Sequence, residues 1–418
     1  MKKIKICVIG LGYVGLPLAI NFAKKNFYIF GIDNDLKKID YLRNKKSYLS
    51  SLSNNEIINV AKKKNIHFTN NYSCIKDVNY IIICLPTPLK KRSPDLSFLI
   101  NSIDKIAKHI QKNQTIILES TSYPGTTKLL ADRLALHTKL ILEKDFFFGF
   151  SPERENPGGE LASVKIPKVI SAFSDKGLEN LKKIYGRVFK EIVLSSKVEE
   201  AEAAKLLENC FRSVNISLIN ELRDLFNKTD LDIWKIIEIA KTKPFGFMPF
   251  YPSVGAGGHC IPVDPVYLSW FAKKNKFKTT FIDNSIKLNQ KTPIKIANHI
   301  TKQIKLKKAY DKNLIIFGIT YKKNVNDIRE SSSLKIFKIL YKRFNRVFYY
   351  DSNVRSIKID KKTIINSLNK KDLNNKKNYI SIITVNHDLV NYNKIFKDSF
   401  LIYDCVNKFS KNKKIISI

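Results

Sequence analysis

The residues best suited to covalent chemistry lie in the segment Gly257-Gly-His-Cys260-Ile-Pro-Val-Asp264-Pro265. Cys260 falls in a loop and not in an apolar run, and the two glycines allow backbone to pass close to a ligand. A thiol becomes a nucleophile when nearby positive charge or a helix N-terminus lowers its pKa. Asp264 before Pro265 also has the pattern of an N-cap that opens a helix over Val266–Lys274. A cap and a catalytic carboxylate are compatible, and both interpretations stay open.

A second group of residues is suited to binding a dinucleotide. A glycine-rich loop follows the apolar run Lys5–Ile9 and reads Gly10-Leu-Gly12-Tyr13-Val14-Gly15. These glycines allow a tight turn, approach of backbone to a pyrophosphate at a helix N-terminus, and close helix–strand packing. Asp33 ends the next apolar run, where a carboxylate can bind ribose hydroxyls, and Asp35 rather than an arginine follows nearby. The pattern favours NAD over NADP, although a glycine-rich turn and a surface aspartate would need no ligand.

Further candidates lie in loops and on one predicted helix, and each also has an ordinary structural explanation. Ligands of a doubly wound sheet bind at the carboxyl ends of its strands. The loops Cys84–Pro88 and Glu119–Gly125 each follow a predicted strand and should therefore face the dinucleotide. Lys205 and Asn209 are four residues apart and share one helix face, which by default is a solvated surface. The loop candidates are Pro86 and Thr87 in Cys84–Pro88, Thr121 in Glu119–Gly125, Glu153 in Ser151–Gly158, and Tyr321, Lys322 and Arg329 in Tyr321–Ser331.

These residues need an alternating α/β framework to position them. Short apolar runs alternate with helical patterns over residues 1–195, which predicts a parallel, doubly wound sheet. Residues 196–304 read as a helical domain that carries the Cys260 loop, and residues 305–418 as a second, smaller alternating domain. The predicted strands are Lys5–Ile9, Phe27–Ile32, Tyr80–Leu85, Thr115–Leu118, Phe147–Phe150, Val169–Ala172, Arg346–Tyr350, Ile380–Thr384, Phe400–Tyr403 and one that begins at Asn313.

Composition narrows the class of protein. The 418 residues include 74 Lys and Arg against 37 Asp and Glu, a formal net charge of +37. The lysines are scattered rather than grouped in blocks, which favours a compositional bias over a nucleic-acid surface. No apolar run reaches the roughly 18–20 residues that span a bilayer. The six cysteines are widely spaced, which predicts a reduced cytoplasmic protein with five buried thiols, one reactive thiol and no metal site.

Taken in order, these segments resemble the UDP-glucose/GDP-mannose dehydrogenase family over essentially the whole chain. The segment Lys243-Pro-Phe-Gly-Phe-Met-Pro-Phe-Tyr-Pro252 is most similar to the bacterial UDP-N-acetylglucosamine 6-dehydrogenase branch, which makes uronic acids for surface polysaccharides. Three positions depart from the family pattern: Pro157 where the UDP-glucose branch has a second glutamate, Ser253-Val-Gly-Ala before Gly257, and Val406 where an arginine is common.

The resemblance implies two Rossmann-like domains joined by a central helical domain, and oxidation of a primary alcohol to a carboxylate with two NAD per turnover. It implies that Cys260 forms a thiohemiacetal and then a thioester. Lys205 and Asn209 would stabilise the oxyanion, Asp264 and Thr121 would position or deprotonate water, and Glu153 would lie beside the reacting carbon. The implied NAD contacts are Gly10, Gly12, Tyr13, Val14, Gly15, Asp33, Pro86, Thr87, Thr121 and Arg329.

The substrate implied by the resemblance is a UDP-N-acetylhexosamine, bound in part by Glu153, Lys205 and Asn209. Its other implied contacts are Phe250, Tyr251, Gly255, Gly257, Tyr321 and Lys322. UDP-glucose, UDP-N-acetylgalactosamine and UDP-N-acetylmannosamine stay open as alternatives. From another class, a basic nucleic-acid-binding protein on a dinucleotide fold stays open, although we expect no nucleic-acid or membrane partner. A homo-oligomer, formed as a dimer through the central helices, is the expected assembly.

Overall fold

The computed structural model describes residues 3–49, 52–154, 163–229, 231–258, 260–410 and 412–417. Contacts divide the chain into two compact units. Unit 1 consists of Met1–Glu208 and Val266–Phe277, and unit 2 of Asn209–Pro265 and Lys278–Ile418. The domain boundaries at 195 and 304 stay predictions.

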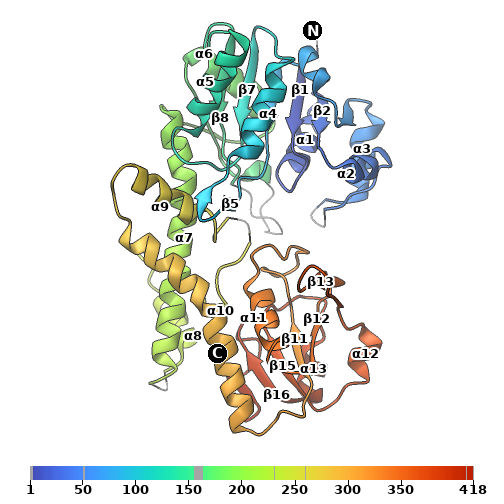
Figure 1. Ribbon diagram of the computed structural model, residues 1–418, viewed down its shortest axis with the longest axis vertical. Helices are drawn as coiled ribbons and strands as arrows, with labels where there is room; N and C mark the ends of the chain where they lie inside the picture. The colour runs from blue at the N-terminus through green and yellow to red at the C-terminus, as the bar shows by residue number, and fades with distance from the viewer. Residues whose placement is uncertain are drawn as a thin grey trace. The chain divides into compact units, whose positions relative to one another are not determined.

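Unit 1 is built on an eight-stranded sheet (Figure 1). All neighbouring strands are parallel except the pair β8 and β9. The order across the sheet is β10 (Ile192–Leu194), β9 (Lys168–Ala172), β8 (Phe146–Phe150), β7 (Gln114–Leu118), β4 (Tyr80–Ile83), β1 (Lys5–Ile9), β2 (Tyr28–Ile32) and β3 (Ile66–Thr69).

Helices flank this sheet because its central strands are apolar on both faces. Every residue of β4, β7 and β8 is buried, as expected for parallel strands covered on each side. Helices α1 (Gly15–Lys24) and α6 (Asp175–Tyr185) share one core, in which the Phe22 and Tyr185 rings lie 5.8 Å apart. Helices α4 (Ser97–Ala107) and α5 (Thr126–Thr138) pack against each other. Smaller elements complete the unit: α2 (Leu36–Arg43), α3 (Asn54–Lys62), η1 (Tyr72–Asp77), η2 (Ser163–Lys165), β5 (Leu89–Lys90) and β6 (Ser93–Pro94).

The antiparallel pair β8 and β9 is a correction to the predicted all-parallel sheet. Its register places Gly149 opposite Ala172 and Phe150 opposite Ser171. No α-helix lies in the described part of the connection between the two strands, whereas a parallel return needs a long crossover. Continuing the same register past the strand end brings residue 153 opposite residue 168.

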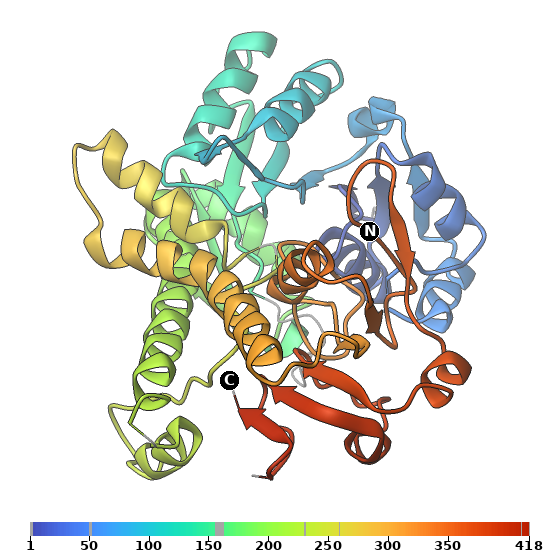
Figure 2. The ribbon, with the colours of Figure 1, turned by 60° about the horizontal axis from the view of Figure 1, so that its bottom comes forward.

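Unit 2 combines long helices with a five-stranded parallel sheet. Helix α7 (Val198–Phe226) runs from unit 1 into unit 2, and α10 (Thr280–Leu306) packs against α11 (Ser332–Tyr341), as Figure 2 shows. The sheet order is β12 (Val347–Tyr350), β11 (Leu314–Phe317), β15 (Tyr379–Ile383), β16 (Ser399–Asp404) and β17 (Ile415–Ser417). The remaining elements of unit 2 are α8 (Ile233–Ala240), the antiparallel pair β13 (Ser356–Lys358) and β14 (Ile364–Asn366), α12 (Lys370–Asn374) and α13 (Tyr392–Asp398). Helix α9 (Asp264–Lys274) starts in unit 2, and its residues from Val266 onward belong to unit 1.

The predicted α/β class with two Rossmann-like sheets is confirmed. All ten predicted strands are present, each with ends within two residues of the prediction. Helix α9 begins at Asp264 and not at Val266, so the aspartate lies in the first helical turn. Within the described residues, no helix is both long and apolar enough to cross a membrane.

Candidate active site

The glycine-rich loop of unit 1 has the geometry of a dinucleotide cradle. Gly10 has a φ of 92°, and a Cβ there would lie 2.5 Å from the carbonyl oxygen of Cys84. A Cβ at Gly15 would lie 1.9 Å from the carbonyl oxygen of Gly10, so this position requires glycine for the helix to approach the strand. At Gly12, by contrast, a Cβ would meet no described atom within 4 Å. Gly12 therefore borders open space at the start of α1, where Tyr13 and Val14 turn into the helix.

Asp33 closes this loop from the end of β2. Its carboxylate accepts hydrogen bonds from the backbone N–H groups of Leu11 and Asp35, each at 2.9 Å. The Lys38 ammonium lies 3.3 Å from the same carboxylate, and the Tyr48 hydroxyl donates to the Leu11 carbonyl. The ribose-binding candidate is thus fixed directly beside the glycine loop, as the dinucleotide pattern requires.

The loops after β4 and β7 meet at the same edge of the sheet. The buried hydroxyl of Thr87 donates to the Thr121 carbonyl over 2.8 Å, and the Tyr267 hydroxyl donates to the Thr87 carbonyl over 3.0 Å. Pro86 is exposed beside this contact. The structure therefore brings together the two proline-containing loops that were assigned to the cofactor.

Glu202 on α7 is a residue that the sequence analysis did not identify. Its buried carboxylate accepts hydrogen bonds from the backbone N–H groups of Gly125 (2.6 Å) and Thr127 (2.8 Å), and from the hydroxyls of Thr127 (2.6 Å) and Ser122 (3.3 Å). Burial raises the pKa of Glu202 to about 7. Lys205 follows three residues later on the same helix and is only 9% exposed, so it does not belong to a solvated surface. Glu202 therefore anchors the Thr121 loop to the turn of α7 that precedes Lys205.

Glu153 belongs to a buried ionic cluster. The Lys168 ammonium lies 3.1 Å from the Glu153 carboxylate and 2.7 Å from the Glu119 carboxylate. The Tyr185 hydroxyl donates to the second oxygen of Glu119. Glu119 was predicted only as the first residue of a loop, and Lys168 was not among the predicted site residues. The rest of the Glu153 loop, including Pro157, lies outside the described residues.

In unit 2, Cys260 lies in the turn that leads into α9. The thiol residue is exposed, and its carbonyl accepts from the backbone N–H groups of Val263 (3.0 Å) and Asp264 (2.8 Å). The side-chain amide of Asn209 donates to the Asp264 carboxylate, which is 3% exposed. The structure thus joins two of the predicted catalytic residues, Asn209 and Asp264. Asp264 lies four residues after a third, Cys260.

The other cysteines have different environments. Cys7, Cys210 and Cys405 are buried, whereas Cys74 and Cys84 are half-buried, so the expectation of five buried thiols was wrong for two of them. Burial, together with the negative charge of Asp264, raises the pKa of Cys210 to about 12. Cys210 is therefore a poor nucleophile at neutral pH, although it follows directly after Asn209.

The glycines before Cys260 pack on a candidate substrate residue. A Cβ at Gly257 would lie 2.8 Å from the Tyr321 Cβ, and a Cβ at Gly258 would lie 2.8 Å from the Tyr321 ring. The Gly258 N–H donates to the Arg329 carbonyl over 3.1 Å. The Arg329 guanidinium is half-exposed; its Nε donates to both carboxylate oxygens of Asp327 at 3.0 Å, and its Nη2 donates to one of them at 2.7 Å. His259 lies outside the described residues.

Buried polar groups of α7 hold the predicted substrate loop. The Arg223 guanidinium, 2% exposed, donates to the Ser253 carbonyl over 3.0 Å, and the Ser253 N–H donates to the Asn220 side chain over 2.9 Å. The Gly255 N–H donates to the Ser253 hydroxyl over 3.3 Å. Gly255 has a φ of 120°, a backbone conformation that L side chains rarely adopt. Ser253, one of the departures from the family pattern, therefore helps to shape this turn.

Aromatic contacts fix the two residues that begin this loop. The Phe250 ring lies 5.9 Å from the Phe211 ring, and the exposed Tyr251 ring stacks on Trp234 at 5.7 Å. The Tyr251 hydroxyl donates to Glu238 over 3.1 Å.

A buried histidine joins three loops at the carboxyl ends of β11, β12 and β15. The Asn324 backbone N–H donates to His387 Nδ1 over 3.0 Å, so Nε2 carries the proton and faces the Asp351 carboxylate at 3.1 Å. Burial opposes ionisation of Asp351, but the hydrogen bond to His387 and two backbone N–H groups outweigh it and hold its pKa below the usual value. The loop that His387 and Asp351 hold carries Tyr321 and Lys322. The pKa of Lys322 is lowered mainly by burial and also by the positive charge of Arg212.

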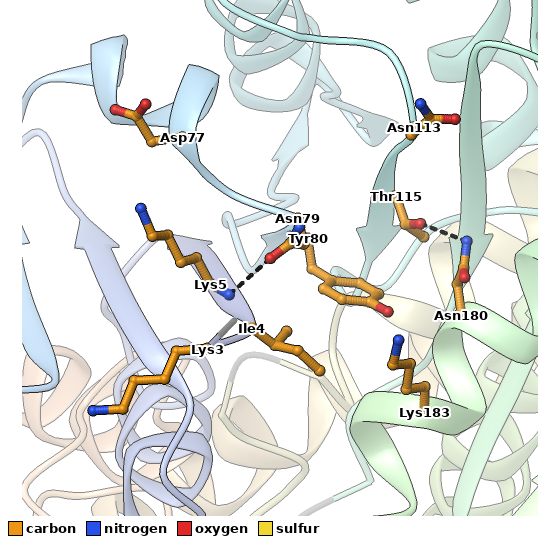
Figure 3. A pocket seen from close by; sticks show the side chains of 10 residues that line it. All are labelled: Lys3, Ile4, Lys5, Asp77, Asn79, Tyr80, Asn113, Thr115, Asn180 and Lys183. Carbon is orange, nitrogen blue, oxygen red and sulfur yellow. Dashed lines mark hydrogen bonds between the residues drawn. The ribbon is translucent and has the colours of Figure 1, made fainter. Parts of the chain in front are cut away.

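Neither a metal cluster nor the hollow at the amino ends of the unit 1 strands includes the predicted site residues. Among the described residues, no group of three or more His, Cys, Asp or Glu side chains could hold a metal ion. A hollow of about 650 Å³ lies near the amino ends of β1, β4 and β7. Its lining residues include Lys5, Asn79, Tyr80 and Thr115 (Figure 3). Ligands of doubly wound sheets bind at the carboxyl ends, where the glycine loop, Thr87 and Thr121 lie.

Comparison with known proteins identifies the family. The models of the UDP-glucose/GDP-mannose dehydrogenase family match its NAD-binding domain at residues 4–189, its central domain at 199–291 and its UDP-binding domain at 315–411. The chain is 33% identical to the UDP-N-acetyl-D-glucosamine 6-dehydrogenase of Pseudomonas aeruginosa over 81% of each protein. It is 30% identical to the UDP-N-acetyl-D-mannosamine dehydrogenase of Methanococcus vannielii over 99% of this chain and 92% of that protein.

A solved structure has the same fold. The UDP-D-ManNAc dehydrogenase from Pyrococcus horikoshii matches with a TM-score of 0.88 and 28% identity, over 98% of this chain and 97% of that one. The family resemblance and the NAD cofactor predicted from the motifs are confirmed. The chain therefore belongs to the UDP-glucose/GDP-mannose dehydrogenase family of NAD-dependent nucleotide-sugar dehydrogenases.

Proposed function

We propose that this protein oxidises the 6-hydroxymethyl group of a UDP-N-acetylhexosamine to the uronic acid, with Cys260 as the covalent nucleophile. The observation that carries the proposal is the exposed thiol of Cys260 in the turn that opens α9, in a chain with NAD-binding and UDP-binding family domains. A reactive thiol is what separates a four-electron oxidation from a simple alcohol dehydrogenase, which would stop at the aldehyde.

The chemistry balances as two oxidations and one hydrolysis. Bound NAD supplies the hydride acceptor for each oxidation. The alcohol first loses a hydride from carbon 6 and a proton from oxygen, which gives the aldehyde. The Cys260 sulfur adds to the aldehyde carbon and forms a thiohemiacetal, which again carries a hydride on carbon 6. Loss of that hydride, together with the hydroxyl proton, gives a thioester, and water cleaves it to the carboxylate and the free thiol.

The other predicted residues have polar roles in this scheme. We assign Lys205 and Asn209 to the oxygen of carbon 6, where each donor contributes about 3 kcal/mol by analogy with other oxyanion sites. Asp264 and Thr121 are assigned to the hydrolytic water, and Glu153 to the vicinity of the reacting carbon. The buried contact of Asn209 with Asp264 supports a shared role in unit 2.

NAD fits the residues present in unit 1. Gly12 borders open space at the N-terminus of α1, and Asp33 presents its carboxylate beside that loop. Gly10, Gly15, Tyr13 and Val14 would hold the pyrophosphate end through backbone groups. Pro86, Thr87 and Thr121 would line the nicotinamide end, and Arg329 is assigned as a further contact.

The substrate is assigned as an N-acetylated UDP-sugar because both curated relatives described above act, by their names, on UDP-N-acetylhexosamines. UDP-N-acetyl-D-glucosamine is the first candidate, and the mannosamine epimer is the alternative that the archaeal relatives favour. Phe250, Tyr251, Gly255, Gly257, Tyr321 and Lys322 are assigned to the sugar and the nucleotide. The product, a UDP-uronic acid, is a precursor suited to surface polysaccharides.

NADH release against a panel of UDP-sugars tests the proposal. We expect two NADH per UDP-N-acetylhexosamine consumed, with UDP-N-acetylglucosamine giving the highest kcat/KM. A ratio of one NADH per sugar would contradict the alcohol-to-acid assignment. Release only from UDP-glucose would contradict the N-acetylated substrate but not the chemistry.

We also propose that two copies associate through the central helices. Phe211, Leu218 and Leu225 recur every seven residues on α7 and are each 48–50% exposed. Apolar residues at this spacing form a seam that a second helix can cover. We expect a dimer by sedimentation and a monomer for the variant Leu218→Asp. A monomeric wild-type protein would contradict this assembly.

A further inference from the structure

The ammonium of Lys168, at the start of β9, is a buried charge with a full set of hydrogen-bond partners. It is 2% exposed and lies 2.7 Å from the Glu119 carboxylate, 3.1 Å from the Glu153 carboxylate and 3.3 Å from the Pro152 carbonyl. An ammonium has three N–H donors, so these three acceptors use all of them. The rings of Tyr185 and Phe189 lie 5.4 and 5.2 Å from the nitrogen and enclose it.

Strand register explains why this lysine meets Glu153. Phe150 ends β8 and pairs with Ser171 of the antiparallel strand β9. Three residues beyond Phe150 is Glu153, and three residues before Ser171 is Lys168. The two residues therefore occupy opposite positions in the continued register, where side chains on one face approach each other. The strand was predicted, but its antiparallel direction was not, and this direction places the lysine beside Glu153.

The two carboxylates of the cluster are not equivalent. The Glu119 side chain is 0% exposed, and its second oxygen accepts from the Tyr185 hydroxyl. The Glu153 side chain is 15% exposed, and its second oxygen accepts from the Arg154 backbone N–H over 2.9 Å. Glu119 is the inner counter-ion, whereas Glu153 is the outer carboxylate that solvent or a ligand can reach. With one ammonium between two carboxylates, the cluster carries a net negative charge.

The charged form of this lysine is maintained by its partners. Burial alone lowers the pKa of Lys168, but the charges of Glu119 and Glu153 and their hydrogen bonds raise it above its usual value. Burial raises the pKa of Glu119, against the charge of Lys168, which lowers it. Removal of the ammonium would leave two buried carboxylates facing each other, which is strongly unfavourable.

We propose that Lys168 is a positioning residue for the oxidation: it fixes the orientation and the ionised state of Glu153, and Glu119 is the counter-charge that holds Lys168 in place. This inference rests on the proposed function, in which Glu153 lies beside the reacting carbon. Lys168 acts through Glu153 and needs no contact with substrate.

The test compares the pH dependence of kcat in four variants. Loss of the ammonium in Lys168→Met should move the acidic limb of the kcat profile to higher pH by about one pH unit or more. It should lower kcat at neutral pH about 10- to 100-fold, with the KM values for NAD and UDP-sugar changed less than about threefold. Glu119→Gln should move the same limb to lower pH, because Lys168 then pairs with Glu153 alone. Lys168→Arg should retain most of kcat.

The double variant Lys168→Met/Glu119→Gln separates positioning from folding. It removes both buried charges, so its melting temperature should recover relative to Lys168→Met, while its kcat stays low. Recovery of kcat along with stability would show that Lys168 only neutralises Glu119, and would overturn the inference. An unmoved acidic limb of the kcat profile in both Lys168→Met and Glu119→Gln would overturn it as well. These outcomes presuppose an active wild type, so absence of NADH release from wild-type protein would refute the proposed function and, with it, this role.

Discussion

Replacement of Glu202 by glutamine changes one atom at a junction between α7 and the Thr121 loop. The wild-type carboxylate accepts four hydrogen bonds, from the backbone N–H groups of Gly125 and Thr127 and from two hydroxyls. Glutamine has the same shape but replaces one acceptor oxygen by an N–H donor, and it has no charge. The variant therefore removes the titration of this group while it keeps most of the packing.

The magnitude follows from the pKa of the folded state. Burial raises the pKa of Glu202 from 4.5 to about 7, so the folded protein holds a proton that the unfolded chain has released between these pH values. Stability from this group is therefore fully present below about pH 4.5 and is lost as pH rises through about 7. At about 1.4 kcal/mol per pKa unit, the wild type loses about 3 kcal/mol of unfolding free energy over this window.

The melting temperature of unit 1 as a function of pH measures this effect. At about 2–4 °C per kcal/mol, the wild type should lose about 6–12 °C between pH 4.5 and pH 8 that Glu202→Gln does not lose. The variant should be less stable at low pH, because one N–H donor then faces another, and should approach the wild type at high pH. The matched control is Glu200→Gln on the same helix, whose side chain is 56% exposed. If the melting temperatures of wild type and Glu202→Gln changed with pH by the same amount, the reasoning would be refuted.

Three further predictions concern the site itself. Cys260→Ser should form no uronic acid while it binds NAD with unchanged affinity, and full turnover by this variant would exclude the covalent mechanism. Asp33→Ala should raise the KM for NAD about tenfold or more, the loss of one charged hydrogen bond, with the KM for UDP-sugar unchanged. His387→Ala removes the side chain that holds the Tyr321 and Lys322 loop, and it should raise the KM for UDP-sugar by a similar factor with little change in the KM for NAD. Equal effects on both KM values would indicate general unfolding instead, and a melting curve of the variant tests for that.

Sequence patterns predicted those parts of the fold that local periodicity determines. The buried strand Lys5–Ile9 was located to the residue, because a short apolar run between a polar start and a glycine loop has few other interpretations. The prediction that Asp33 lies beside the glycine-rich loop is confirmed, because the order of the first two strands is fixed in a dinucleotide fold. The start of α9 was placed two residues late, because Pro265 suits the first helical position and hides a helix that begins at Asp264.

The candidate site was predicted only where a motif carries its own chemistry. Cys260 stood out because glycines surround it, and its exposure agrees with that interpretation. Cys210 shows the limit of residue type alone, because it is equally a thiol beside a predicted catalytic residue, yet burial raises its pKa to about 12. Nothing in the sequence around Cys210 distinguishes it chemically; its place on the inner face of α7 does.

The residues that sequence analysis missed share one physical property. Each is a buried titratable group whose partners lie far away along the chain. Glu202 contacts a residue 80 positions away, and His387 one that is 36 positions away. Lys168 meets Glu153 through a strand pair whose direction was not predicted. A buried charge is costly unless its partners are in place, so the fold must supply them together, and no local pattern records the partnership. An isolated lysine before a strand, such as Lys168, has the same local sequence whether it is solvated or buried. What decides its role is the direction of one strand: a parallel β9 would place its first residue at the opposite end of β8 from Glu153. The chemistry assigned to the outer carboxylate therefore depends on topology, and strand direction is the step that local sequence reasoning must resolve first.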